Sequence, residues 1–126
     1  MAVQIIPTQG IKVYRVGHSY LISGSIAIPS GETDFIVPFF VSLATGQTAT
    51  LVKARHSINA GTSVTINLQR NGSTITGYSG VTVNTTPSNT TASQAISDDD
   101  EIALVVTGVS GSPFNLNFTI FIEYSQ

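Results

Sequence analysis

The side chains of this chain alternate between apolar and polar with a period of two, and this pattern restricts its fold more than any other feature. The clearest case is Leu116–Tyr124, where every second residue is apolar and Phe121 stands among the polar residues of the opposite face. A second case, Val64–Leu68, precedes Asn71-Gly72, a pair that readily adopts the positive φ angles of a type I′ hairpin turn. A period of two is the repeat of a β-strand that buries one face, so the sequence predicts strands joined by tight turns.

Further strands are expected along the chain, separated by short segments rich in Gly, Pro, Ser and Asn. They are Ile11–Val16, Ser19–Ile28, Asp34–Leu43, Thr48–Ile58, Ser73–Thr76, Val81–Thr85 and Glu101–Val109. The sequence therefore predicts an all-β fold, an antiparallel β-sandwich or jelly-roll-like barrel. At 126 residues it has the length of a single domain (1–126), with residues 1–10 as an N-terminal arm. The Thr-, Ser- and Asn-rich segment Asn84–Ser97 is expected to form a long or mobile excursion.

Composition argues against several classes of protein. The chain has no cysteine, which excludes disulfides and thiolate zinc sites. Five Lys and Arg against seven Asp and Glu give a net charge of −2, so no nucleic acid is expected as a partner. The longest apolar run, Phe35–Val41, is much shorter than a membrane-spanning segment, and no membrane insertion is expected. The first residues lack the basic and apolar regions of a secretory signal, which predicts synthesis in a cytoplasm.

The segment Phe35–Val41 is apolar on both faces, whereas a strand of a lone sandwich normally has one wet face. Pro38 cannot donate a backbone hydrogen bond, so this strand is expected at a sheet edge or at a bulge. Its second face either meets another subunit or is buried under a loop or the N-terminal arm. The residues assigned to a subunit interface are Phe35, Ile36, Pro38, Phe40 and Phe121.

Residues that could carry chemistry are sparse, and the sequence predicts a binding or assembly module without cofactors and not an enzyme. The two histidines, His18 and His56, have no metal-ligand spacing, and the chain contains no Gly-x-Ser-x-Gly nucleophile elbow. His18 stands in a Gly-His-Ser sequence between two predicted strands. Both histidines are therefore expected at the surface or in turns.

Four consecutive acids form the only run of charge, and two of them, Asp98 and Asp100, are candidate calcium ligands. The alternative, which we favour, is a tight turn in which Asp side chains bond to their own backbone. A second hypothesis is that this acidic run meets basic residues of a neighbouring subunit, namely Lys53, Arg55 or Arg70.

A glycan site is a further hypothesis, with Asn71, Asn84 and Asn89 as hydrogen-bonding residues and Tyr14, Tyr20 or, preferably, Tyr78 as a stacking platform. Tyr78 lies in the turn-like sequence Thr-Gly-Tyr-Ser-Gly, which makes it the best candidate for an exposed ring. The alternative, which we favour, is a turn tyrosine that covers the preceding hairpin. The two interpretations of Tyr78 differ in whether a ligand can reach its ring.

Several segments of the C-terminal half resemble the β-domains of tailed-phage virion proteins, especially those of actinobacteriophages. They are Thr62–Gly72, Ile75–Val83, Asp98–Pro113 and Leu116–Tyr124. In that group such a module is a terminal domain of minor tail or fibre proteins, or a small free-standing virion component, and it is commonly trimeric. This chain departs from long fibres because it has no collagen-like or coiled-coil stem.

The resemblance implies a virion structural protein that is made in the host cytoplasm and located in the virion. We expect a homotrimer attached to the tail as a minor tail or tip component, in contact with other virion proteins or the host surface. A capsid decoration protein that stabilises the head is the first alternative. A glycan-binding module that recognises host cell-surface polysaccharide is the second.

Overall fold

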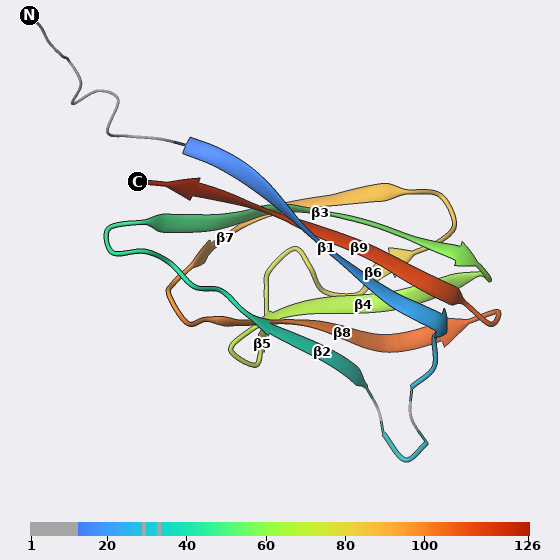
Figure 1. Ribbon diagram of the computed structural model, residues 1–126. Helices are drawn as coiled ribbons and strands as arrows, with labels where there is room; N and C mark the ends of the chain where they lie inside the picture. The colour runs from blue at the N-terminus through green and yellow to red at the C-terminus, as the bar shows by residue number, and fades with distance from the viewer. Residues whose placement is uncertain (1–12, 29, 33) are drawn as a thin grey trace, which may run out of the picture.

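The computed structural model describes residues 13–28, 30–32 and 34–126, which fold into two antiparallel β-sheets stacked face to face (Figure 1). One sheet has the strand order β1-β9-β3-β7, and the other has the order β2-β8-β4-β5, with β6 also paired to β4. The strands are β1 (Val13–Ser25), β2 (Phe35–Phe40), β3 (Thr48–Ala60), β4 (Ser63–Arg70), β5 (Ser73–Thr74), β6 (Val81–Val83), β7 (Ser88–Ile96), β8 (Glu101–Ser110) and β9 (Phe114–Ser125). This part of the chain contains no helix that is long and apolar enough to cross a membrane. The predicted N-terminal arm lies outside the described residues.

The strands pair in a nested order: β1 with β9, β2 with β8, β3 with β7 and β4 with β6. Nested antiparallel pairs distributed over two sheets are the arrangement of a jelly roll. The prediction of an all-β, antiparallel sandwich is therefore confirmed, and the strand order is that of a jelly roll.

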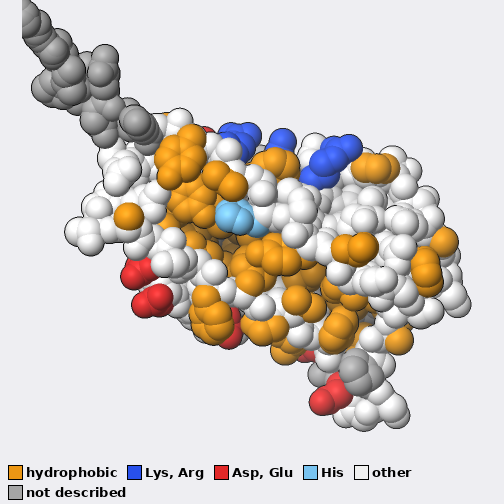
Figure 2. All heavy atoms as spheres, viewed as in Figure 1, with side chains coloured by type: hydrophobic (Ala, Val, Ile, Leu, Met, Phe, Trp, Pro, Cys, Tyr) orange, Lys and Arg blue, Asp and Glu red, His pale blue; other side chains and the backbone are white. Residues whose placement is uncertain are grey.

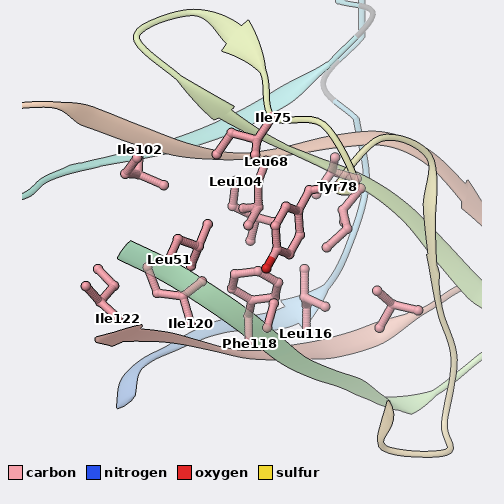
Figure 3. Close-up of a cluster of buried hydrophobic side chains, with 14 of the residues drawn as sticks. Leu51, Leu68, Ile75, Tyr78, Ile102, Leu104, Leu116, Phe118, Ile120 and Ile122 are labelled. Carbon is pink, nitrogen blue, oxygen red and sulfur yellow. The ribbon is translucent and has the colours of Figure 1, made fainter. Parts of the chain in front are cut away.

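The core lies between the two sheets, where the inward-facing residues of each strand meet (Figure 3). In β9 the alternating residues of Leu116–Ile122 are all buried, as the period of two predicts. They face Leu68 of β4 and Leu104 of β8, which are exposed by only 1% and 2%. Burial of one such side chain contributes about 1.5–3 kcal/mol, so this two-layer core is the main source of stability.

The turn predicted at Asn71-Gly72 is confirmed. The φ angles of Asn71 and Gly72 are 50° and 85°, and the flanking residues Arg70 and Ser73 pair across the turn. Two positive φ angles are what a type I′ hairpin requires, and Asn and Gly adopt them at the lowest cost.

Two predictions about strands were wrong. The turn expected at Gly17-His18 is absent, because β1 runs without a break from Val13 to Ser25. Gly17 lies opposite Phe121, and a Cβ atom at Gly17 would be 3.1 Å from Cε1 of Phe121, so this glycine makes room for a ring and does not end a strand.

The segment Asn84–Ser97 is not a long excursion, because most of it is strand β7, paired with β3. Its threonines fit a pleated edge strand. Thr90, Ala92, Gln94 and Ile96 point toward the core, but the first three are small or polar and hide the apolar alternation.

Candidate functional site

A sandwich has two lateral openings between its sheets, and one of them is closed by Tyr78. This residue follows β5, and its ring is 1% exposed within the core (Figure 3). Its hydroxyl donates a hydrogen bond of 2.7 Å to the carbonyl of Ala92 in β7 and accepts one of 3.3 Å from the amide of the same residue. The ring therefore connects the segment beside β4 to the edge of the other sheet.

The hypothesis that Tyr78 is an exposed stacking platform was wrong. Burial raises the pKa of Tyr78 above its ordinary value, and both hydrogen-bonding functions of its hydroxyl are used inside the protein. The sequence showed a tyrosine among glycines and serines, which suits a turn. It did not show that the turn folds back over the core.

The opposite opening, between edge strands β1 and β2, holds a cleft of about 140 Å³. In this cleft the ring of Tyr20 on one sheet stacks on the ring of Phe39 on the other, with centroids 4.7 Å apart. Figure 2 shows apolar side chains gathered over this part of the molecule, with a histidine among them. The cleft is lined by His18, Tyr20, Phe39, Phe40, Val41, Ser42, Ile122 and Tyr124.

Polar atoms converge at the β1 side of this cleft. Nε2 of His18 is hydrogen-bonded to the hydroxyl of Tyr124 at 3.1 Å, and the ring of Tyr124 stacks on Tyr14 with centroids 5.5 Å apart. Burial, together with the neighbouring tyrosine, raises the pKa of Tyr20 and of Tyr124 above the ordinary value. Both hydroxyls therefore stay protonated at neutral pH and can donate or accept hydrogen bonds.

The outer face of β2 carries a second apolar surface, which we call the β2 strip: Ile36, Pro38, Phe40 and, beside them on β8, Ala103 and Val105. Ile36 is 51% exposed and Phe40 is 72% exposed, whereas Ala103 and Val105 are covered by their neighbours. Strand β2 lies at the edge of its sheet, which confirms the position predicted from Pro38.

The residues assigned to a subunit interface do not lie on one surface. Ile36, Pro38 and Phe40 face outward, but Phe35 faces the core and packs against it, because successive residues of a strand point to opposite sides. Phe121 lies on the outer face of the other sheet, where Nζ of Lys53 is 4.8 Å from the centroid of its ring.

The asparagines of the proposed glycan site are separated and serve the fold. Asn71 follows the last residue of β4, whereas Asn84 follows β6, which pairs with the beginning of β4. Asn84 accepts a hydrogen bond from the amide of Thr86 in a turn, and Asn89 accepts one of 3.4 Å from Arg55. The structure therefore does not bring Asn71, Asn84, Asn89 and Tyr78 together.

The acidic run forms the favoured tight turn, and the two calcium candidates hold the backbone in place. Asp98 accepts a hydrogen bond of 2.7 Å from the amide of Leu43. Asp100 is 6% exposed and accepts hydrogen bonds from the Ser97 amide at 2.7 Å, Asn71 at 2.8 Å and Arg70 at 2.5 Å. The described residues contain no group of three or more His, Cys, Asp or Glu placed to hold a metal ion.

The environment of Asp100 bears on the hypothesis that the acidic run meets basic residues of a neighbouring subunit. Burial alone would raise the pKa of Asp100, but the hydrogen bonds from Ser97, Arg70 and Asn71 and the charge of Arg70 outweigh it and lower that pKa. Arg70 is therefore bound within its own chain and is not available to a partner's acids.

The expectation that the histidines lie at the surface or in turns was wrong for His56, whereas His18 is partly exposed but lies in a strand and not in a turn. His56 is 4% exposed, and its Nε2 atom is hydrogen-bonded to the hydroxyl of Thr90 at 2.9 Å. Burial, together with the charge of Arg55, lowers the pKa of His56, so its ring is held neutral. His18 lies within β1 and lines the cleft.

Sequence reasoning named Tyr20 as one possible stacking residue but preferred Tyr78, and it did not assign His18 or Tyr124 to a site. A signal was present, because Tyr20 and Tyr124 stand at the inward positions of β1 and β9 near an opening of the sandwich. That opening can be recognised only once the strand order is known.

The fold and the cleft define a jelly-roll β-sandwich with accessible aromatic side chains between two edge strands. No family model matches the chain, and no curated protein is significantly similar to it in sequence. One solved structure with a similar arrangement is the native structure of a family 35 carbohydrate binding module from Clostridium thermocellum, with a TM-score of 0.44 and 10% identity. The similarity covers 89% of this chain and 96% of that chain.

Proposed function

We propose that this protein is an assembly module that binds further copies of itself through the β2 strip, as a structural subunit of a tailed-phage virion. The observation that supports this proposal is an edge strand whose outward side chains include Ile36 and Phe40, exposed by 51% and 72%. Exposed apolar edge strands promote association, and soluble proteins normally protect them with charge or cover.

The energy available at the β2 strip suits a subunit contact. Full burial of an Ile or Phe side chain contributes about 1.5–3 kcal/mol, and Ile36 and Phe40 still expose half or more of their surface. A homotrimer would bury these side chains, because a closed cyclic assembly covers the same surface on every copy. The sequence resemblance supports a place in the virion, as a minor tail or tip component or, alternatively, as a capsid decoration protein.

The oligomeric state tests this proposal. We expect sedimentation equilibrium to give an oligomer for the wild type and a monomer for Phe40→Glu, which places a charge in the strip. Val109→Glu is the matched control, because Val109 is also an exposed apolar residue, 42% exposed, near the other end of β8. A wild type that remains monomeric at all accessible concentrations contradicts self-association. Mass analysis of separated heads and tails then tests the place in the virion.

A second candidate function, glycan binding, is favoured by the cleft and not by the asparagines. Rings of Tyr20, Phe39 and Tyr124 lie there beside the polar atoms of His18, and apolar walls with a few convergent polar groups are typical of small-ligand sites. We expect such a site to bind host cell-wall polysaccharide and to lose that binding in Tyr124→Ala. Wild-type protein that is not retained by the polysaccharide refutes this candidate.

A further inference from the structure

The acidic residues of the described chain, except Glu123 of β9, gather around the β2 strip. Glu32 and Asp34 precede β2 at one end, and Glu101 lies opposite Phe40 at the other, next to Asp98 and Asp99. We call these five residues the acidic rim. Arg70, the base in this region, is paired with Asp100, so the rim keeps its negative charge.

Basic residues gather on the outer face of the other sheet. Lys53 lies opposite Phe121 in the strand pairing and covers its ring, and Arg55 and Arg15 occupy neighbouring rows of the same face. We call Arg15, Lys53, Arg55 and Phe121 the basic face. Glu123 lies on the same face and pairs with Arg15 at 3.4 Å, so the net positive charge of this face comes from Lys53 and Arg55. Figure 2 shows Lys and Arg along the upper edge of the molecule and most Asp and Glu toward the lower edge.

These two surfaces differ in charge but share an apolar centre. If two copies met strip to strip, their acidic rims would face each other, and like charges across a contact are unfavourable. If the strip of one copy meets the basic face of the next, opposite charges surround a contact between Phe40 or Ile36 and Phe121. Charge complementarity therefore favours two different surfaces over one self-complementary surface.

We propose that the β2 strip and acidic rim of one copy dock on the basic face of a second copy. This inference rests on the proposed self-association and names the surface that receives the strip. A contact between unlike surfaces passes from copy to copy and closes into a ring when the rotation allows it. It also gives Phe121 and Ile36 roles on opposite sides of one contact, although they lie on different sheets of the same chain.

The test uses charge reversal on each surface. The face variant combines Lys53→Glu with Arg55→Glu, and the rim variant combines Glu32→Lys with Glu101→Lys. Each variant alone brings like charges together, and we expect its self-association constant to weaken by about tenfold or more. In an equimolar mixture, every contact between the two different variants places opposite charges together, so we expect mixed complexes to form with near wild-type pairwise affinity. A ring of three keeps one contact between like variants, so complete recovery of a trimer is not expected. Wild-type association is expected to weaken with added salt.

Ser79→Lys is the matched control, because it adds a positive charge at an exposed turn near the opposite edge of the β2 sheet. Circular dichroism and thermal unfolding check that every variant remains folded. If both charge variants weaken association but their mixture forms no mixed complexes, the contact does not join these two surfaces and the inference is overturned. If charge reversal has no effect while Phe40→Glu still dissociates the oligomer, the inference fails but self-association stands. A monomeric wild type overturns both.

Discussion

Replacement of Asp100 by Asn tests how the acidic turn is held to the sandwich. The buried carboxylate accepts hydrogen bonds from the amide of Ser97, the side chain of Asn71 and the guanidinium of Arg70. Asp100→Asn keeps the shape of the side chain but removes its negative charge. It also places an NH2 group where one carboxylate oxygen accepts hydrogen bonds. Hydrogen bonds to charged groups contribute about 1.5–3 kcal/mol each, and loss of a fully buried partner costs about 3–5 kcal/mol. Since the side chain of Arg70 is 32% exposed, we expect a loss of about 2–3 kcal/mol in the free energy of unfolding.

The pH dependence of this loss has a definite sign. The pKa of Asp100 is lower in the folded protein than its ordinary value of 3.8. The stabilisation by the carboxylate is therefore complete above about pH 4–5 and is lost as the pH falls through the folded-state pKa. Urea unfolding of the wild type and the variant at several pH values should show a difference that is largest near neutrality and narrows in acid.

The matched control is Asp99→Asn. Asp99 is exposed and has a φ of 64°, a conformation that Asn tolerates, so we expect a change below about 0.5 kcal/mol. The assignment of Asp100 as an anchor is refuted if its substitution costs no more than the control. It is also refuted if the difference from the wild type is independent of pH down to about pH 2.

Three other substitutions test the core and the turns. Tyr78→Phe should lower the free energy of unfolding by about 1–3 kcal/mol, because the carbonyl of Ala92 loses its hydroxyl donor; an unchanged urea midpoint contradicts this role. Gly77→Ala should lower the free energy of unfolding by about 1–3 kcal/mol more than Gly46→Ala does. Both glycines have positive φ, but only at Gly77 would the new Cβ lie 2.5 Å from Cβ of Ala92. Equal losses of stability in the two variants would exclude that clash. Because burial lowers the pKa of His56 below 6.5, the free energy of unfolding should fall as the pH drops below about 6.5. His56→Gln should remove this contribution to the pH dependence of stability. An unchanged pH dependence in the variant argues against a buried neutral ring.

The fold was predictable where the alternation of side chains is strong. Periodicity predicted which face of β9 is buried, and turn chemistry predicted the hairpin turn at Asn71-Gly72. Pro38 predicted the edge position of β2. Strand β7 was missed, because its inward residues, such as Thr90 and Ala92, are too small or too polar to give an apolar period. The break predicted in β1 failed for a related reason, since a glycine that accommodates a neighbouring ring is indistinguishable in sequence from one that ends a strand.

The candidate site was less predictable, because it depends on which strands become neighbours at the sides of the sandwich. Tyr78, Tyr20 and Tyr124 have the same side chain, yet one closes the core and two line a cleft. The sequence distance between Tyr20 and Phe39 gives no hint that their rings stack across the two sheets. Such contacts follow from the nesting of the strands, and this nesting is set by long-range pairing.

The two edges of the sandwich differ in a way that supports the proposed self-association at β2. Strand β7 is also an edge strand, but its outward residues are polar or small, such as Asn89, Thr91 and Ser93, and Tyr78 closes the opening beside it. An edge with polar side chains resists pairing with other chains, which is the usual protection. Strand β2 instead carries Ile36 and Phe40 outward, beside an opening that holds a cleft. The outward apolar residues of β2 therefore support the proposal that a partner covers this edge.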